Sequence, residues 1–261
     1  MNSGGNLRGA GILITRPARQ AAGLAREIAA LGGRPLIFPA IVILPPEDRR
    51  ALEKAQRELS SYDYAVFVSA NAVEYGVGAV AAWPLKLIAF APGPGTAAAL
   101  AAVGVTNVRV PATTMDSEGL LVLPEFQSVA DKRIVIFRGG GGRELLGETL
   151  ASRGASVDHV DCYRRARPES GATGLEEALC EGRIDAVTLT SSEGLDNLWN
   201  ILGAEARERF AAIPAFVPHP RIAEHARDLG ISRPIVTAPA DAGLIAALLE
   251  YFGTAGGLPD N

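Results

Sequence analysis

The chain has 261 residues, of which 48% are hydrophobic and 21% are charged. A single-core domain usually has about 100–150 residues, so this length favours two domains. The formal net charge of −4 argues against a general nucleic-acid or membrane-surface binder, because such proteins concentrate positive charge.

Two cysteines, Cys162 and Cys180, are distant from each other and form no cluster with histidine, so neither a zinc site nor a disulfide framework is indicated. A reducing cytoplasm is the expected location. Residues 1–11 lack the apolar core of a signal peptide, and no apolar run approaches the roughly 18 residues that span a bilayer. We therefore expect a soluble, cytoplasmic protein.

Short β-branched runs that alternate with alanine- and leucine-rich helical segments predict an α/β protein with parallel sheets. Several runs are almost wholly apolar, as strands covered on both faces should be. In chain order, the expected strands are GILIT (11–15), YAVFVS (64–69), KLIAF (86–90), NVRV (107–110), RIVIF (133–137), DAVTLT (185–190), PAFV (214–217) and PIVTA (234–238). Two further extended segments, LIFPAIVIL (36–44) and VDHVDCYRR (157–165), are predicted to connect two lobes.

The chain contains an internal repeat. The segment that begins at Ile12 matches the one that begins at Ile134, which places Arg16 over Arg138, and the same offset of 122 residues places Ser69 over Ser191. FAPGPGTAAALAAVGV, from Phe90, then aligns with FVPHPRIAEHARDLGI. If the segment that begins at Ile12 is called a, the segment that contains Ser69 and Phe90 is called b, and their second copies are a′ and b′, the order along the chain is a, b, a′, b′. These matches leave open whether the lobes are a with b and a′ with b′ or the crossed pairs.

The glycine-rich turn RGGGGRELLGETL follows the strand RIVIF. It does not contain the GxGxxG dinucleotide fingerprint, and it has Glu148 where a P-loop needs lysine. We expect a helix to begin near Gly142 and to present unpaired N–H groups, which suit carboxylates as well as phosphates. The alternative is a flexible turn that binds no ligand.

Small, polar or basic residues occur in every turn between a strand and a helix. Such turns lie at the carboxyl ends of parallel strands, where ligands bind, and two facing lobes would make a cleft lined by them. The alternative for each hydroxyl is that it only caps a helix. The residues predicted to bind substrate are Arg16, Ser69, Ala70, Asn71, Gly95, Thr96, Arg138, Gly139, Gly140, Ser191, Ser192, His219 and Arg221.

Tyr163 is the candidate catalytic residue. It lies in DCYRR within the second connecting segment, where a phenol could donate a proton to a departing hydroxyl group. The alternative is that the ring packs between the lobes and that its hydroxyl binds to backbone.

Motifs in a fixed order from about Gly11 to Phe252 resemble the bacterial uroporphyrinogen-III synthase family. They are ITRPARQAAGLAREIAALGGRPLIFP, FVSANAVEYGV, GPGTAAALAAVGV, DSEGLL, RGGGGRELLGETLASRGASVDHVDCYRR and HPRIAEHARDLGI. The resemblance implies two flavodoxin-like parallel-sheet lobes joined by a two-stranded antiparallel ladder, in a duplication whose chain crosses over. It places residues 1–37 and 168–261 in one lobe, 46–157 in the other, and 38–45 and 158–167 in the ladder.

The resemblance also implies the reaction. Members of the family are lyases that cyclise the linear tetrapyrrole hydroxymethylbilane to uroporphyrinogen III, with loss of water and inversion of ring D, in porphyrin and haem biosynthesis. No metal or organic cofactor is expected. Because the substrate has eight carboxylates, the glycine turn would be one of several carboxylate sites. Tyr163 matches the tyrosine proposed as general acid, and Ser69, Thr96 and Ser191 match hydroxyls of the binding turns.

Two other functions would fit parts of this pattern. A non-catalytic paralogue that binds a tetrapyrrole or another acidic metabolite would keep the turns but could dispense with Tyr163. A flavin- or nucleotide-dependent enzyme is disfavoured by the two failed phosphate motifs. We expect a monomer without nucleic-acid or membrane partners, in transient contact at most with the enzyme that makes hydroxymethylbilane.

Overall fold

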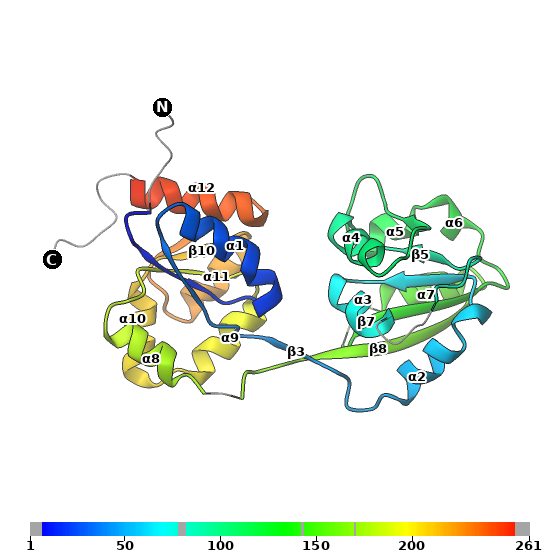
Figure 1. The fold of residues 1–261 in the computed structure, drawn as a ribbon, viewed down its shortest axis with the longest axis horizontal. Helices are drawn as coiled ribbons and strands as arrows, with labels where there is room; N and C mark the ends of the chain where they lie inside the picture. Colours follow the sequence, from blue (N-terminus) through cyan, green and yellow to red (C-terminus); the bar gives the residue numbers. More distant parts are fainter. Residues whose placement is uncertain (1–6, 78–81, 142–143, 170, 254–261) are drawn as a thin grey trace. The chain divides into compact units, whose positions relative to one another are not determined.

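The computed structural model describes residues 7–77, 82–141, 144–169 and 171–253. The chain divides into two compact units (Figure 1): unit 1 is formed by Met1–Val42 with Ala166–Asn261, and unit 2 by Ile43–Arg165. Each unit therefore combines one segment of the first copy of the repeat with one segment of the second, which is the crossed arrangement. The finer lobe limits implied by the resemblance stay a prediction.

Unit 1 contains a five-stranded parallel sheet in the order β11-β10-β9-β1-β2. Its strands are β1 (Gly11–Ile14), β2 (Arg34–Ile37), β9 (Ala186–Thr188), β10 (Ala215–Val217) and β11 (Pro234–Val236). Its helices are α1 (Ala18–Ala30), α8 (Thr173–Cys180), α9 (Ser192–Ile201), α10 (Ala204–Ala212), α11 (Pro220–Asp228) and α12 (Ala240–Gly253).

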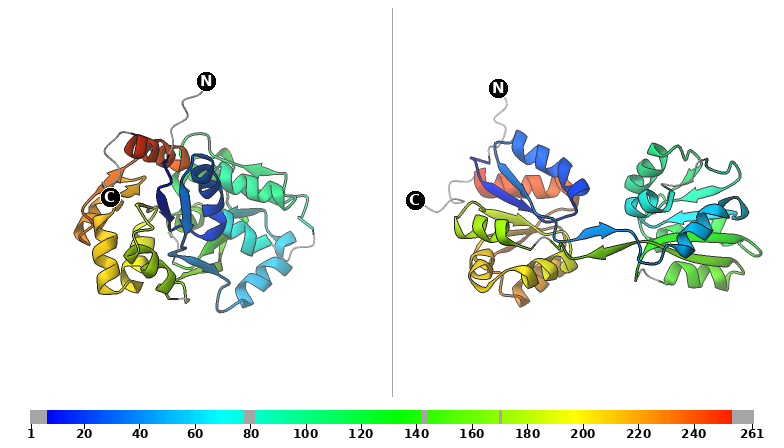
Figure 2. Two further views of the ribbon diagram at one scale, coloured as in Figure 1. Left: turned by 60° about the vertical axis from the view of Figure 1, so that its left-hand side comes forward. Right: turned by 60° about the horizontal axis from the view of Figure 1, so that its bottom comes forward.

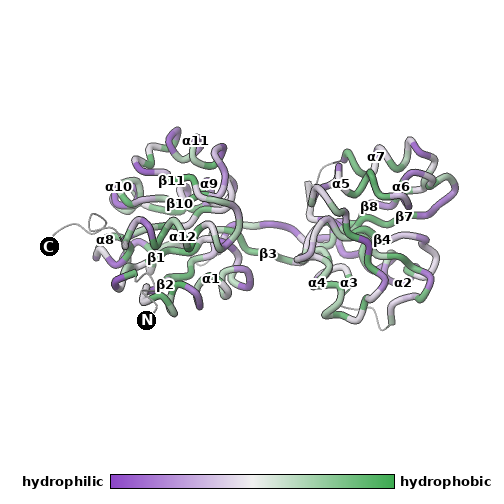
Figure 3. Tube along the Cα trace, turned by 90° about the horizontal axis from the view of Figure 1, so that it is seen from above, coloured by the Kyte–Doolittle hydropathy of each residue, from purple (hydrophilic) through white to green (hydrophobic). Residues whose placement is uncertain are grey.

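Helices cover both faces of the sheet of unit 1 (Figure 2). Ile12 and Ile14 face a core formed with α1 and α12, whereas Leu13 faces a second core formed with α8, α9, α10 and α11. This division follows from the period of two along a strand, which sends successive side chains to opposite faces. Figure 3 accordingly shows the central strands as hydrophobic along most of their length.

Unit 2 contains a six-stranded sheet in the order β3-β8-β7-β4-β5-β6. Its strands are β3 (Val42–Leu44), β4 (Tyr64–Phe67), β5 (Ile88–Phe90), β6 (Val108–Arg109), β7 (Arg133–Gly139) and β8 (Ser156–Ala166). Its helices are α2 (Arg50–Arg57), α3 (Ala70–Val77), α4 (Pro94–Ala102), α5 (Ser117–Leu121), α6 (Pro124–Gln127) and α7 (Leu145–Ser152), with a short 3₁₀ turn at Leu59–Ser61. Strands β4 to β8 are parallel. β3 pairs with β8 at the edge of this sheet, and the two strands run in opposite directions (Figure 2).

Only one of the two predicted connecting segments forms a continuous strand in the structure. The segment 157–165 lies within one continuous strand, β8, as expected. The segment 36–44 does not form one strand, because β2 ends at Ile37 and β3 begins at Val42. The N–H groups of Phe38 and Ala40 still donate to the carbonyls of Ile14 and Thr15 at 3.0 and 2.8 Å, while Pro39, between them, has no N–H to pair on the other side.

An ion-pair network lies at the amino ends of β7 and β8. The guanidinium of Arg133 donates to Glu58 at 2.9 Å and to Asp158 at 3.0 Å, and it lies 4.3 Å from the centre of the Tyr62 ring. The Tyr62 hydroxyl donates to Asp158 at 2.6 Å. Burial alone would raise the pKa of Asp158, but the hydrogen bonds from Tyr62 and Arg133 outweigh it and hold that pKa below its ordinary value.

This network predicts a loss of stability in acid. The folded-state pKa of Asp158 is below its unfolded value. The contribution of the Asp158 carboxylate to the free energy of unfolding is therefore complete above about pH 4, and it is lost as pH falls through the folded-state pKa. We expect Asp158→Asn to lower the thermal unfolding midpoint at pH 7 by about 2–4 °C and to reduce the difference between the midpoints at pH 7 and pH 3. Asp228→Asn, at an exposed position of α11, is the control. An Asp158→Asn protein with the pH dependence of the wild type would contradict this expectation.

Candidate functional site

The Tyr163 hydroxyl is paired with a second hydroxyl in unit 2. Its oxygen lies 3.2 Å from Ser69 Oγ, and either atom could donate. Tyr163 comes from β8, is only 3% exposed and packs in a hydrophobic core of unit 2, whereas the alternative interpretation expected its ring between the lobes. That interpretation also expected a backbone partner for the hydroxyl, and the partner found among the described residues is the Ser69 side chain.

Ser69 connects this pair to the start of helix α3. Its Oγ accepts a hydrogen bond from the Ala72 N–H at 3.1 Å. An oxygen that already accepts this bond can turn its own hydrogen toward Tyr163. The arrangement therefore favours Ser69 as donor to the Tyr163 oxygen, which leaves the phenol hydrogen free for another acceptor.

The glycine turn has a geometry different from the one predicted. Gly139 is the last residue of β7, and the Gly140 N–H donates to the Tyr163 carbonyl at 3.0 Å, so this N–H is already used within the fold. Gly141 has a φ of 76°, in the left-handed region that favours glycine. The predicted helix start near Gly142 lies outside the described residues; in the residues that the structure describes, the helix after the turn, α7, begins at Leu145.

Arg138 is held by two carboxylates. Its Nη1 donates to Glu144 Oε1 at 2.8 Å, its Nε donates to Asp161 Oδ1 at 3.0 Å, and its side chain is 14% exposed. The hydrogen bond from Arg138 lowers the pKa of Glu144, so this carboxyl group stays charged at neutral pH. A substrate carboxylate would have to compete with both acids for this guanidinium.

Arg16, the counterpart of Arg138 in the repeat, is also paired with an acid. Its Nη2 lies 2.7 Å from Asp241 Oδ1, in the first turn of α12, and its side chain is 13% exposed. The sequence analysis did not predict these acidic partners of the two arginines. The register of neighbouring strands that pairs Arg138 with Asp161 is not visible in a local pattern.

Three of the predicted binding side chains cap helices. Ser69 caps α3 as described above, Ser191 Oγ accepts from the Gly194 N–H at 3.0 Å at the start of α9, and His219 Nδ1 accepts from the Arg221 N–H at 3.1 Å at the start of α11. Capping is thus confirmed for these residues. Their contact with substrate stays a prediction.

The remaining candidates lie in the first turns of helices that follow the carboxyl ends of strands. The first N–H groups of a helix have no acceptor within it and can bind an anionic group. These residues are Ala70 and Asn71 in α3, Gly95 and Thr96 in α4 and Ser192 in α9. Arg221 lies in the first turn of α11, but its N–H already donates to His219.

The two copies of the repeat differ at the chemically important position. The offset of 122 residues places Ile41 of unit 1 where unit 2 has Tyr163, and Pro17 where unit 2 has Gly139. Both copies keep the capping serine, Ser69 or Ser191. The pair of hydroxyls is therefore a property of unit 2.

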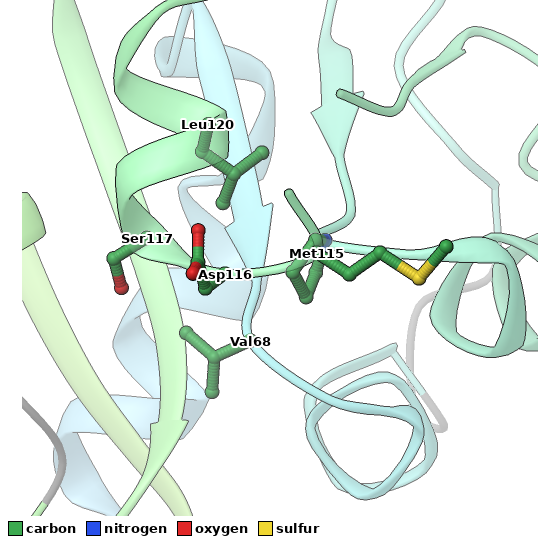
Figure 4. A pocket seen from close by; sticks show the side chains of 6 residues that line it. Val68, Met115, Asp116, Ser117 and Leu120 are labelled. Carbon is green, nitrogen blue, oxygen red and sulfur yellow. The ribbon is translucent and has the colours of Figure 1, made fainter. Parts of the chain in front are cut away.

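A pocket of about 260 Å³ lies beside the turn after β4 (Figure 4). It is lined by Val68, Pro92, Met115, Asp116, Ser117 and Leu120. The Asp116 carboxylate accepts from the Gly119 N–H at 2.8 Å. Because the Asp116 carboxylate lies in this wall and would repel a second carboxylate, the pocket suits an uncharged group better than a carboxylate.

Two features are absent from the part of the chain that the structure describes. No group of three or more histidine, cysteine, aspartate or glutamate side chains there is arranged to hold a metal ion. None of the helices in those residues is long and apolar enough to cross a membrane.

A family model described as uroporphyrinogen-III synthase HemD matches residues 22–246. Two similar proteins are the uroporphyrinogen-III synthases of Salmonella typhimurium and Escherichia coli, which are 37% and 35% identical over 226 residues. Each alignment covers 84% of this chain and 91% of the relative.

Solved structures show the same fold. A mutant uroporphyrinogen III synthase from Thermus thermophilus gives a TM-score of 0.57 at 20% identity and covers 92% of this chain and 98% of its own. The uroporphyrinogen-III synthetase of Helicobacter pylori gives 0.57 at 13% identity, with 92% and 99% covered. At these identities the likeness concerns the fold alone, and it confirms the predicted fold class.

Proposed function

The chain belongs to the uroporphyrinogen-III synthase family, and we propose that Tyr163 supplies the proton for the reaction of that family. The reaction cyclises hydroxymethylbilane to uroporphyrinogen III with loss of water, and the chain is an enzyme of this lyase class. The observation that carries the role of Tyr163 is the 3.2 Å contact between its hydroxyl and Ser69.

The proposed step is general acid catalysis. As the bond between the terminal methylene carbon and its hydroxyl oxygen breaks, the Tyr163 O–H donates its proton to the leaving oxygen and water departs. Ser69 keeps its proton and donates a hydrogen bond to the phenolate oxygen, while the Ala72 N–H donates to Ser69. Ring closure releases a proton from the attacked pyrrole carbon, which returns the phenolate to its neutral form.

We propose that helix starts bind the substrate carboxylates. Ala70 and Asn71 begin α3 in unit 2, and Ser192 begins α9 in unit 1. Backbone N–H groups at such positions carry a partial positive charge and bind an anion without a basic side chain. Binding by backbone explains how a chain with a net charge of −4 can hold a substrate of the same sign.

Arg138→Ala should weaken substrate binding more than it slows the bound complex. Loss of the guanidinium leaves Glu144 and Asp161 as uncompensated charges that repel a carboxylate. We expect the KM to rise about 10-fold and kcat to fall less than about 3-fold in steady-state kinetics. The matched variant Glu144→Gln keeps the arginine and should not raise the KM. A larger effect of Arg138→Ala on kcat than on KM would contradict the binding role.

We further propose that the protein acts as a monomer in the cytoplasm. The lone cysteines, one buried and one exposed, suit a reducing compartment. Contact with the enzyme that makes hydroxymethylbilane would be transient and would shorten the time that the unstable substrate spends in solution.

Resolution of the product isomers tests the activity directly. Hydroxymethylbilane is made in situ without oxygen, incubated with the protein, oxidised and separated into type I and type III porphyrins. Predominantly type III product is expected. Only type I product, which forms without catalysis, from folded protein that still binds the substrate would instead identify a non-catalytic binder.

A further inference from the structure

We propose that Gly139 is a positioning residue for Tyr163, because its missing side chain leaves the space that the phenol ring occupies. This inference rests on the proposed role of Tyr163 as the proton donor. It assigns the first glycine of the turn a function other than binding a carboxylate.

The contact is too close for any side chain at position 139. A Cβ atom built on Gly139 would lie 2.6 Å from Tyr163 Cζ, 2.7 Å from Cε2 and 3.0 Å from the hydroxyl oxygen. Carbon atoms in contact are separated by about 3.5–4.0 Å. An alanine at this position would therefore force the ring to retreat by roughly 1 Å.

Backbone conformation does not explain this glycine. Gly139 lies in β7, and its φ is outside the left-handed region, unlike that of Gly141 at 76°. Any residue can adopt an extended backbone. What position 139 requires is space, and the atoms that need the space belong to the outer end of the Tyr163 ring.

The ring cannot move without moving its hydroxyl. Tyr163 is 3% exposed, and its carbonyl accepts the Gly140 N–H at 3.0 Å, so the backbone on which the ring is carried is held in place. The hydroxyl is 3.2 Å from Ser69, near the limit of a hydrogen bond. A shift of roughly 1 Å away from Gly139 would change the place from which the proton is donated.

The repeat supports the same conclusion independently. In unit 1 the position of Tyr163 is taken by Ile41, which has no ring, and the position of Gly139 is taken by Pro17, which carries a full side chain. The copy without the phenol thus also lacks the glycine.

Gly139→Ala tests the inference through kcat. We expect kcat to fall about 100-fold with less than about a 3-fold change in KM, because a misplaced proton donor slows the bound complex. In a Tyr163→Phe background there is no hydroxyl to misplace, so Gly139→Ala should lower kcat less than about 2-fold further. Gly140→Ala, where a Cβ would meet nothing within 4 Å, is the control for folding of the turn.

The possible outcomes separate this inference from the proposed function. Wild-type kcat in Gly139→Ala, together with a slow Tyr163→Phe, would overturn the positioning role and leave the proton donor intact. An unchanged kcat in Tyr163→Phe would overturn the proton donor itself. Equal losses from Gly139→Ala in both backgrounds would show that the glycine acts independently of the hydroxyl, and would also overturn the inference.

A stability measurement covers the case in which Gly139→Ala folds poorly. Tyr163→Leu removes the ring atoms that the new Cβ would meet. If the ring is the obstacle, Gly139→Ala should lower the thermal unfolding midpoint less in the Tyr163→Leu background than in the wild type. The same decrease in both backgrounds would overturn the inferred contact.

Discussion

Tyr163→Phe is expected to lower kcat by about 10–1000-fold while the protein remains folded. The substitution removes one oxygen atom that is bound to Ser69 at 3.2 Å, and it keeps the ring that packs against Gly139. The ring contributes most of the burial of this side chain, so the core of unit 2 should be preserved. Single-turnover kinetics with isomer analysis would measure the loss in the bound complex.

A control for the loss of a phenol oxygen from a partly buried tyrosine is Tyr75→Phe. The Tyr75 ring lies 6.2 Å from that of Tyr163, but its hydroxyl donates to the Ile43 carbonyl at 3.0 Å. We expect kcat of this variant to stay within about 2-fold of the wild type. If Tyr163→Phe retains full activity, or if Tyr75→Phe is equally slow, Tyr163 is not the specific proton donor.

Phe137→Ala is expected to lower the free energy of unfolding of unit 2 by about 3–5 kcal/mol. Phe137 is 1% exposed and stacks on Phe67 with ring centres 4.9 Å apart. A Cβ on Gly76 of α3 would lie 3.1 Å from the Phe137 ring, so the helix is packed closely against it. Removal of the ring therefore leaves a cavity between β7, β4 and α3. Urea denaturation monitored by circular dichroism would measure the loss.

Phe137→Leu is the control for this variant because it keeps most of the apolar volume. We expect it to cost less than about 1.5 kcal/mol. Equal losses in the two variants would show that the cavity is not the cause. Phe137 directly precedes Arg138 and Gly139, so Phe137→Ala should also reduce activity in conditions where the protein is still folded.

The alternation of strand-like and helix-like segments along the chain makes the α/β class predictable from the sequence. The strands at residues 133–137 and 185–190 were found because apolar, β-branched runs are needed where both faces of a sheet are covered. The repeat that relates Ile12 to Ile134 predicted two similar sheets. Their crossed pairing was left open by the repeat and followed from the family resemblance.

The site was less predictable because its contacts join distant parts of the chain. Residue types point to Tyr163 and to the glycine turn, but they do not show which groups these residues contact. The acids beside Arg138 were missed, because Asp161 becomes its neighbour only through the register of β7 and β8.

The sequence by itself determined the class of fold, the repeat and the residue types from which the site is built, because these depend on local composition and period. Only the tertiary structure decided that Gly139 lies against the ring of Tyr163 and that Ser69 lies beside its hydroxyl. These contacts depend on the pairing of β7 with β8, whose register shifts between Arg138 and Gly139. A shift of one residue in that pairing would turn each side chain to the opposite face of the sheet, and no local pattern in the chain encodes it.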